Sequence, residues 1–541
     1  MTSHASTTER IGADHLDLAP VPRPMLPHAR LVFALLTLGT TAVTALTVAL
    51  FVAEWSGWAI LAMGLILPSL LWIAGGAATA LTGLICAAPS SPAIPPGWTP
   101  RRRSAILVLL CCEAPQAVAL RLLALSRELK QAGLEPHCRL IVLSDTFGPD
   151  AIAAEEAALA PLVRDGVLHY RRRANNRGKK PGNIAEWFDR QGDAFGQMLV
   201  LDADSRMSGR RIATMIYRME STPSLGLLQA GMALVPADSR FGQAQRTASR
   251  LLGPPYAIGL SAWAADTANY WGHNALIRTA AFASAARLPR LSGPAPYGGE
   301  ILSHDFIEAA VIRSAGWTVE FDPDPAGSHE DGPQTLATYH KRNRRWCQGN
   351  LQHIRLLGWR GLHPLSRLHI ASGIFSFLAA PVWLVLLMLM GSGLVRMEGG
   401  LPFVLILCVL LVPKICGLYR LAGPSGTAWR RRIAFKAFGG ELVSSSLLAP
   451  IIMLHHTAAV LSVLAGQDCG WKGRGPRPGA SLPRGSFELL VGVALTGMVI
   501  TLNPVAAVWI APVAGPMVAA PLLIRWMDAV RPEIRRAPLS A

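Results

Sequence analysis

The feature that most limits the possible fold of this chain is a pair of long apolar regions, one on each side of a more polar central region. About 20 consecutive apolar residues in a helix are enough to cross the hydrocarbon core of a bilayer. The middle, residues 100–366, has the mixed composition of a soluble α/β domain. We therefore predict a membrane protein built around one globular domain. The predicted spans are residues 31–53, 58–86, 370–395, 401–419, 487–502 and 505–524.

The charge of the chain supports a membrane setting. Lysine and arginine (51) outnumber aspartate and glutamate (34), which gives a net charge of +17. Arginine clusters at 101–103, 430–432 and 535–536 stand beside apolar stretches. Such clusters mark the cytoplasmic side of membrane proteins, so we expect a lipid bilayer and no nucleic acid as partner. The eight cysteines include no CxxC pair, which argues against a zinc site or a disulfide framework.

One apolar stretch, residues 438–464, does not fit a simple count of spans. If it crossed the bilayer, the basic loop 466–485 would lie outside, against the positive-inside rule. The stretch also contains Pro450, His455 and His456. We therefore predict an interfacial helix under the cytoplasmic leaflet, followed by a cytoplasmic loop that contains Trp471 and Lys472. The alternative is a true span, which would allow eight spans in all.

These considerations divide the chain into seven parts. They are a disordered cytoplasmic tail (1–30), two transmembrane helices (31–88), the globular domain (100–366), two transmembrane helices (367–422), the interfacial helix with its cytoplasmic gating-type loop (433–485), two transmembrane helices (486–526) and a cytoplasmic tail (527–541).

Strand and helix patterns alternate within the globular domain. Apolar strands are predicted at 104–113, 139–145 and 318–321, with helices at 115–132 and 306–315. This alternation predicts a parallel, doubly wound sheet that binds ligands at the carboxyl ends of its strands. Neither a GxGxxG fingerprint nor a Walker A loop is present, so neither a dinucleotide cofactor nor an ATPase is indicated.

A buried strand at 198–201 ends in two carboxylates, Asp202 and Asp204. Side chains two positions apart in a strand point to the same side. Two carboxylates at the end of a buried strand suit a hard divalent cation, and such a cation commonly carries a diphosphate. The alternative is an Asp-rich turn without a ligand.

Other polar residues of the domain suggest a site when they are taken together. Arg342, Arg345 and Trp346 share one face of a predicted helix. Guanidinium groups suit a diphosphate and an indole suits the apolar face of a sugar. Asp145 ends a strand and Asp305 begins a helix. Each has an ordinary explanation, since a basic helix near a membrane is often only a solvated face and an aspartate often caps a helix.

The order Asp145, Asp202-x-Asp204, Asp305 and Arg342-x-x-Arg345-Trp346 resembles the D, DxD, D, (Q/R)xxRW signature of the processive inverting family-2 glycosyltransferases, the group of cellulose and hyaluronan synthases. Four longer segments, at 143–146, 270–275, 301–310 and 344–351, closely resemble one subfamily, the glucans biosynthesis glucosyltransferase H of osmoregulated periplasmic glucan synthesis. The resemblance is strong over about residues 100–370. It implies a GT-A fold, an α/β domain with a doubly wound mixed sheet inserted between transmembrane helices.

The resemblance also implies a donor, a metal and residue roles. The donor is UDP-glucose, the metal Mg²⁺ or Mn²⁺, and the product a β-1,2-linked glucan. Asp145 would contact the uracil, Lys179 or Lys180 the diphosphate region, Asp202 would support the diphosphate site, and Asp204 would bind the metal.

On the acceptor side, the resemblance makes Asp305 the general base, places Arg342 and Arg345 on the diphosphate and puts Trp346 at the acceptor. One departure from cellulose synthases is His304, where they commonly carry Glu before the catalytic Asp. Larger members of the subfamily also have a long N-terminal region that is nearly absent here, so we carry over no regulatory role for it.

Two other functions fit parts of the sequence. One is the synthesis of a different polymer, such as cellulose or a β-1,3-glucan; against a bacterial cellulose synthase, no cyclic-di-GMP-binding module made of an RxxxR segment plus a PilZ-like domain follows the last span. The other is a transporter with a cytoplasmic regulatory domain, although the clear spans carry few charges. For the subfamily, the expected location is the bacterial inner membrane with the catalytic domain in the cytoplasm. The expected partners are the growing glucan acceptor, an acyl carrier protein and a periplasmic glucan-processing protein.

Overall fold

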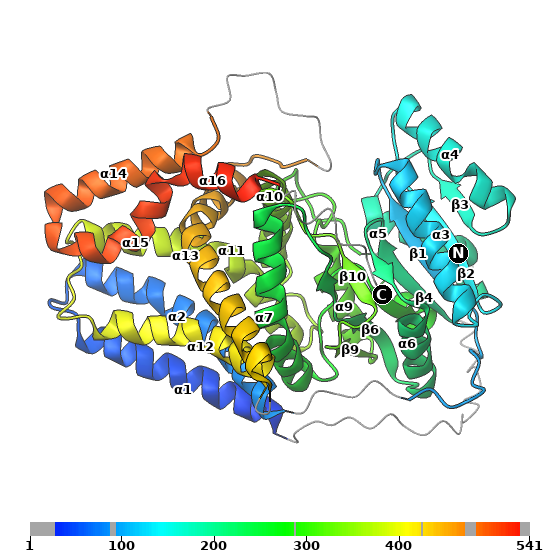
Figure 1. Cartoon of the computed structure of the whole chain (residues 1–541), viewed down its shortest axis with the longest axis horizontal. Helices are drawn as coiled ribbons and strands as arrows, with labels where there is room; N and C mark the ends of the chain where they lie inside the picture. Colours follow the sequence, from blue (N-terminus) through cyan, green and yellow to red (C-terminus); the bar gives the residue numbers. More distant parts are fainter. Residues whose placement is uncertain (1–27, 87–92, 286–287, 424–425, 471–482, 531–541) are drawn as a thin grey trace, which may run out of the picture.

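A computed structural model describes residues 28–86, 93–285, 288–423, 426–470 and 483–530. Apolar helices gather on one side of the molecule, and the sheets with their covering helices lie on the other (Figure 1). The helices of the apolar side are α1 (Ala29–Leu50), α2 (Gly57–Ile85), α11 (Pro364–Gly391), α12 (Leu401–Ala422), α13 (Ala428–Leu464), α14 (Ser486–Leu502), α15 (Ala507–Val518) and α16 (Ala520–Asp528).

Within the described residues, five helices are long and apolar enough to cross a membrane: α1, α2, α11, α12 and α13. A sixth span is formed if Pro504–Val518 and Ala520–Asp528, which meet at a bend of 57°, are counted together, and α14 is shorter and apolar. The predicted stretch 438–464 is part of α13, one continuous helix of 37 residues. Length and composition make it a candidate span, and its interfacial position stays a prediction. Most of the predicted gating loop, including Trp471 and Lys472, lies outside the described residues, as do residues 1–27 and 531–541.

The globular domain is built on a seven-stranded sheet with the strand order β3-β2-β1-β4-β8-β6-β9. Its strands are β1 (Ser104–Leu110), β2 (Cys138–Ser144), β3 (His169–Arg172), β4 (Gln197–Asp202), β6 (Leu225–Ala230), β8 (Ala275–Arg278) and β9 (Thr318–Asp322). Strand β8 runs antiparallel to both of its neighbours, and the other pairs are parallel. The predicted mixed α/β sheet flanked by apolar helices is confirmed.

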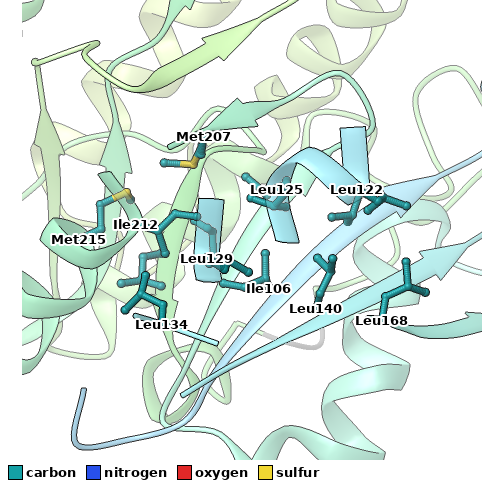
Figure 2. Close-up of a cluster of buried hydrophobic side chains, with 14 of the residues drawn as sticks. Ile106, Leu122, Leu125, Leu129, Leu134, Leu140, Leu168, Met207, Ile212 and Met215 are labelled. Carbon is teal, nitrogen blue, oxygen red and sulfur yellow. The ribbon is translucent and has the colours of Figure 1, made fainter. Parts of the chain in front are cut away.

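Helices cover both faces of this sheet, which explains why all seven residues of β1 are buried. Alternate β1 side chains enter two separate cores: Ile106 and Val108 one, Leu107 and Leu109 the other. Figure 2 shows Ile106 in the first core, close to leucines of the covering helix α3. The covering helices are α3 (Pro115–Gln131), α4 (Pro149–Arg164), α5 (Lys179–Gln191), α6 (Gly209–Ser221), α8 (Thr279–Phe282) and α9 (His304–Ser314).

The strand register places the candidate carboxylates at one edge of the sheet. In the parallel pairs around β1, Leu109 lies opposite Asp202 and Leu110 lies opposite Ser144. Asp145 therefore emerges at the same edge as Asp202. A small second sheet lies beyond this edge, with the order β5 (Arg206–Met207), β10 (Ser328–Glu330) and β7 (Ala233–Leu234).

Two helices join the globular domain to the apolar helices: α7 (Arg240–Ala264) and α10 (Leu336–Gln352). Helix α7, which the sequence patterns did not predict, contacts α2, α12 and α13 (Figure 1). A Cβ atom on Gly83 of α2 would lie 1.7 Å from the carbonyl oxygen of Pro255, and one on Gly259 would lie 1.8 Å from that of Thr79. The two backbones are thus in direct contact, and only glycine fits at both positions.

Candidate active site

Asp145, at the end of β2, is held by a dense set of polar contacts. The guanidinium of Arg173 donates to both carboxylate oxygens, at 2.5 and 2.8 Å, and the amide of Asn183 donates to Oδ1 at 2.9 Å. The Asp145 carbonyl accepts a hydrogen bond from Asn176 at 2.6 Å. Only 5% of Asp145 is exposed. Its predicted contact with uracil is untested, and the structure shows that this carboxylate orders the segment leading to α5.

The two predicted lysines open α5, directly after Gly178, which has a left-handed backbone (φ 68°). Lys180 Nζ donates to a carboxylate oxygen of Asp202 and, at 2.8 Å, to the carbonyl of Gly272. Burial lowers the pKa of Lys179, while Asp468 opposes this shift. Lys180 thus lies between the turn Asp202-Ala203-Asp204, called the DAD turn below, and the 270–275 motif. Lys179 is close to the segment that follows α13.

Asp202 and Asp204 differ in their electrostatic surroundings. Burial raises the pKa of Asp202, but Lys180 and His273 outweigh it, so the pKa lies below its usual value. The pKa of Asp204 is raised, first by burial and second by the charge of Asp202. The Ser205 hydroxyl accepts a hydrogen bond from the Asp202 amide at 3.0 Å and fixes the turn between them. Asp202 has its counter-charge in Lys180, and the surroundings of Asp204 favour the addition of positive charge.

His273 and Glu330 join this cluster, and neither was predicted as a site residue. His273 Nε2 lies 3.3 Å from a Glu330 oxygen. Burial lowers the pKa of His273, but Glu330 and Asp202 raise it to about 9. His273 lies in the 270–275 motif noted in the sequence, whereas nothing local marks Glu330. Glu330 reaches the cluster only because its strand, β10, pairs with β5, the strand that directly follows the DAD turn.

A divalent cation fits this cluster if the protein and a bound phosphate compound both supply its ligands. Among the described residues, no three His, Cys, Asp or Glu side chains are grouped to hold a metal ion by themselves. The carboxylates are nevertheless the oxygen donors that Mg²⁺ and Mn²⁺ prefer. Burial first, and then the negative charge of Asp202, raise the pKa of Asp204, so positive charge placed next to this carboxylate would be favourable. A cation held by Asp204 and by the phosphate oxygens of a ligand would satisfy both observations.

Asp305 lies in the first turn of α9. Burial raises its pKa, His304 opposes the shift, and Glu308 adds to it. His304 Nδ1 lies 3.2 Å from a Glu308 oxygen, so the residue that departs from the cellulose-synthase pattern forms an ion pair behind Asp305. The Ser303 side chain makes no capping hydrogen bond to the helix. A carboxylate with a raised pKa is a stronger base once it is ionised.

Gly272 connects the Asp305 side to the Asp202 side. A Cβ atom on Gly272 would lie 3.5 Å from a carboxylate oxygen of Asp305, and its φ of 90° favours glycine. Its carbonyl accepts hydrogen bonds from Lys180 Nζ and from the hydroxyl of the fully buried Tyr270, both at 2.8 Å. One peptide thus lies beside Asp305 and also holds the lysine that pairs with Asp202.

Helix α10 carries the predicted Arg-x-x-Arg-Trp pattern toward the same cluster. The Arg342 guanidinium lies 4.5 Å from the centre of the Trp346 ring, which is 47% exposed. Burial lowers the pKa of Arg342, while Glu330 and Asp204 oppose the shift, so this guanidinium lies within electrostatic range of both carboxylates. Its buried Nε finds no hydrogen-bond acceptor among the described residues. Arg345 is near enough to Lys179 to lower the pKa of that lysine.

Gln348, one turn after Arg345, is a contact residue that sequence reasoning missed. Its side-chain amide donates to Asp468 at 2.7 Å and accepts from the backbone N–H of Cys469 at 2.8 Å. The chain that leaves α13 is therefore fastened to the helix that carries Arg342 and Trp346. The glutamine lies within the 344–351 segment, but its partner is 120 residues away, so no local pattern predicts the contact.

Comparisons with known proteins show which families and proteins the chain resembles. Residues 198–418 match the family model described as Glycosyl transferase family group 2. The chain is 36% identical over 511 residues to the glucans biosynthesis glucosyltransferase H of Xanthomonas campestris pv. campestris (strain B100), covering 85% of this chain and 78% of that protein. The protein of the same name from Vibrio cholerae serotype O1 is 37% identical over 462 residues, covering 78% of this chain and 64% of that one.

A solved structure is also similar: the mannosyltransferase PcManGT from Pyrobaculum calidifontis in complex with GDP-Man and Mn²⁺. It aligns with a TM-score of 0.48 and 14% identity, covering 75% of this chain and 98% of that one.

Proposed function

We propose that this chain, which belongs to the glucans biosynthesis glucosyltransferase H family of family-2 glycosyltransferases, polymerises glucose from UDP-glucose into a β-1,2-linked glucan and exports it. The observation that carries the proposal is the bridge through Gly272. It brings a carboxylate suited to proton acceptance, Asp305, next to a lysine and carboxylates suited to a sugar diphosphate. A base and a diphosphate site separated by one peptide match the needs of direct sugar transfer.

In the proposed reaction, Asp305 accepts the proton of an acceptor hydroxyl as its oxygen attacks the anomeric carbon of the donor glucose. The bond from that carbon to the diphosphate breaks, UDP leaves, and the configuration inverts. Arg342, Arg345 and Lys180 stabilise the negative charge that develops on the departing diphosphate. Trp346 offers its exposed ring to the acceptor sugar.

The donor is assigned to the carboxyl edge of the sheet. Asp145 orders the uracil side through Arg173 and Asn183, Lys179 lies near the diphosphate, and Asp202 supports the diphosphate site by holding Lys180. A divalent cation, Mg²⁺ or Mn²⁺, held by Asp204 would supply further positive charge to the diphosphate.

We further propose that the protein lies in the bacterial inner membrane with its catalytic domain in the cytoplasm. The product would leave through the apolar helices, against which α10 packs directly. The growing glucan is the acceptor, and an acyl carrier protein and a periplasmic glucan-processing protein are the proposed partners. The contacts of Gln348 with Asp468 and Cys469 support a loop after α13 that acts at the donor site.

The test is incorporation of UDP-[14C]glucose by membranes that contain the protein, followed by linkage analysis of the product. We expect a labelled polymer of 2-linked glucose, absent from membranes that lack the protein and not formed from labelled UDP-galactose. A 4-linked or 3-linked product would show that the proposed linkage is wrong, while the protein would still be a glucosyltransferase. Failure to use any nucleotide sugar would overturn the proposal.

A further inference from the structure

A cationic cavity that is separate from the candidate active site lies where α7, α12 and the start of α13 meet. Its volume is about 490 Å³, and its lining includes three arginines, one from each helix: Arg250, Arg420 and Arg430. The volume is in the range typical of small-molecule sites. Figure 1 shows α7 beside the apolar helices α12 and α13, and the three helices contact one another.

The arginines of this cavity lack carboxylate partners within the described part of the chain. Arg430 Nε donates to the carbonyl of Leu421 at 2.9 Å, and Arg420 donates to the carbonyl of Gly83 at 3.4 Å. These contacts orient the guanidinium groups and leave their charge uncompensated. None of the described residues that line the cavity is acidic. Three guanidiniums around one cavity suit a phosphate group, which arginine binds through paired N–H donors.

The backbone around the cavity is built for close packing. A Cβ atom on Gly417 of α12 would lie 2.3 Å from the carbonyl oxygen of Leu251 in α7, so the two helices touch at the cavity wall. The N-terminus of α13 opens beside it, with Thr427 as its capping residue. The positive end of the helix dipole adds to the attraction for an anion.

The surroundings of the cavity are those of a membrane surface. Tyr419 (58% exposed) and Trp429 (73% exposed) directly precede the lining residues Arg420 and Arg430 in the sequence, and aromatic residues of this kind collect at the level of lipid headgroups. Ile415, one turn before Tyr419 in the candidate span α12, is 54% exposed and offers an apolar surface to acyl chains.

We propose that this cavity binds the phosphate of an anionic phospholipid headgroup, with the acyl chains lying along α12. A free phosphate ion would satisfy the arginines equally, but the flanking aromatic and aliphatic side chains favour a lipid. Helix α7 also leads from the small sheet that holds Glu330 toward the segment that holds Tyr270 and Gly272. The bound lipid therefore stabilises a helix that connects the bilayer to the candidate active site.

The test uses the full-length protein purified in detergent and measures retained phosphatidylglycerol and phosphatidylcholine by native mass spectrometry. The variant is Arg250→Gln combined with Arg430→Gln. The control, Arg431→Gln combined with Arg432→Gln, removes the same charge from exposed positions outside the cavity. Each arginine near an anionic lipid strengthens binding of that lipid on the order of fivefold. We expect the variant to lose phosphatidylglycerol roughly tenfold or more relative to the control, and phosphatidylcholine binding to stay unchanged.

Two results would overturn the proposal. Equal losses in variant and control would mean that only overall surface charge attracts the lipid. Displacement of the lipid by millimolar inorganic phosphate would assign the cavity to a free anion. Should the double variant fail to elute as the wild type on gel filtration, Arg250→Lys takes its place. It keeps the charge but loses the bidentate geometry, so a loss of about threefold is expected, and wild-type retention would count against the site.

Discussion

The two walls of the candidate active site are built on opposite principles. The sheet wall, formed by the ends of β2 and β4 with α5, carries Asp145, Arg173, Lys180 and Asp202, which pair with one another. The helix wall, formed by α10, presents Arg342 with a buried Nε that has no acceptor among the described residues, beside a half-exposed Trp346. One wall is complete within the protein, and the other has room for an anion.

This difference suggests a division of labour. Paired charges on the sheet wall hold the backbone in place before any ligand arrives, because breaking a buried pair leaves an uncompensated charge. Cationic groups on the helix wall would gain their partners only when a diphosphate binds. The sheet wall should therefore respond to mutation mainly through stability, and the helix wall mainly through activity.

The largest expected effect comes from removing the cation that would join the two walls. EDTA should reduce glucose transfer to background, and added Mg²⁺ or Mn²⁺ should restore it, because the cation that Asp204 would hold supplies positive charge to the leaving diphosphate. Since no three described side chains form a metal site alone, the cation should raise the melting temperature only together with UDP. Full activity in EDTA would leave the guanidinium groups of the helix wall to stabilise the leaving group.

The next effect concerns the stability of the sheet wall. Arg173→Met leaves the buried carboxylate of Asp145 without its charged partner and should cost about 3 kcal/mol, lowering the melting temperature by roughly 6–12 °C. The control is Arg190→Met on α5, where the arginine is 66% exposed and pairs with Glu186. It should change stability by less than about 0.5 kcal/mol. Equal melting temperatures in thermal unfolding of both purified variants would contradict the assignment of a stabilising role to the sheet wall.

The sequence predicted most of the sheet wall because its signals are local. Buried apolar runs ending in polar residues identified β1, β2 and β4, and parallel strands bring their carboxyl ends to one edge. The pairing of Asp145 with Arg173 was not predicted, since Asp145 was assigned to the uracil and Arg173 was given no role. Glu330 was missed for a related reason: its position depends on β10 pairing with a strand more than 100 residues earlier.

The junction with the apolar helices was the least predictable part of the fold. Helix α7 was not predicted because its first half contains several arginines and because Pro254 and Pro255 are adjacent, a pattern typical of a loop. The helix nevertheless continues through both prolines. Its contacts with α2 depend on two glycines 176 positions apart in the sequence, Gly83 and Gly259. The Arg-x-x-Arg-Trp pattern was recognised, but the cluster that it faces required the tertiary structure.

Replacement of the proposed base tests the point where the two walls meet. Asp305→Asn keeps the size of the side chain but removes its ability to accept a proton, so turnover should fall by about 10²-fold or more. Asp165→Asn, at an exposed position after α4, is the matched control and should retain full turnover. If Asp305→Asn made polymer at close to the wild-type rate in the labelled-glucose assay, another group would have to accept the proton.

The helix wall should show the reverse of the response expected for Arg173. Arg342→Gln removes a charged donor from the departing diphosphate, and we expect roughly a tenfold fall in kcat/KM for UDP-glucose. The melting temperature should stay close to that of the wild type. Lys341→Gln, an exposed neighbour on the same helix, is the control for charge. An Arg342→Gln protein as unstable as the Arg173→Met protein would erase the distinction between the walls.

The smallest expected effect is a shift in pH dependence from His304. Burial lowers the pKa of His304, but Glu308 raises it above the usual value, and the charged imidazole opposes the upward shift in the pKa of Asp305. His304→Gln removes that positive charge, so the Asp305 pKa should rise further. Because a general base works only when it is ionised, activity is lost as pH falls through this pKa, and the acidic limb should move to higher pH. We expect a shift of less than about one pH unit in rates measured across the acidic range. His137→Gln, at the amino end of the sheet, should leave the profile unchanged, and a shift of the His304→Gln limb to lower pH would contradict the proposed interaction.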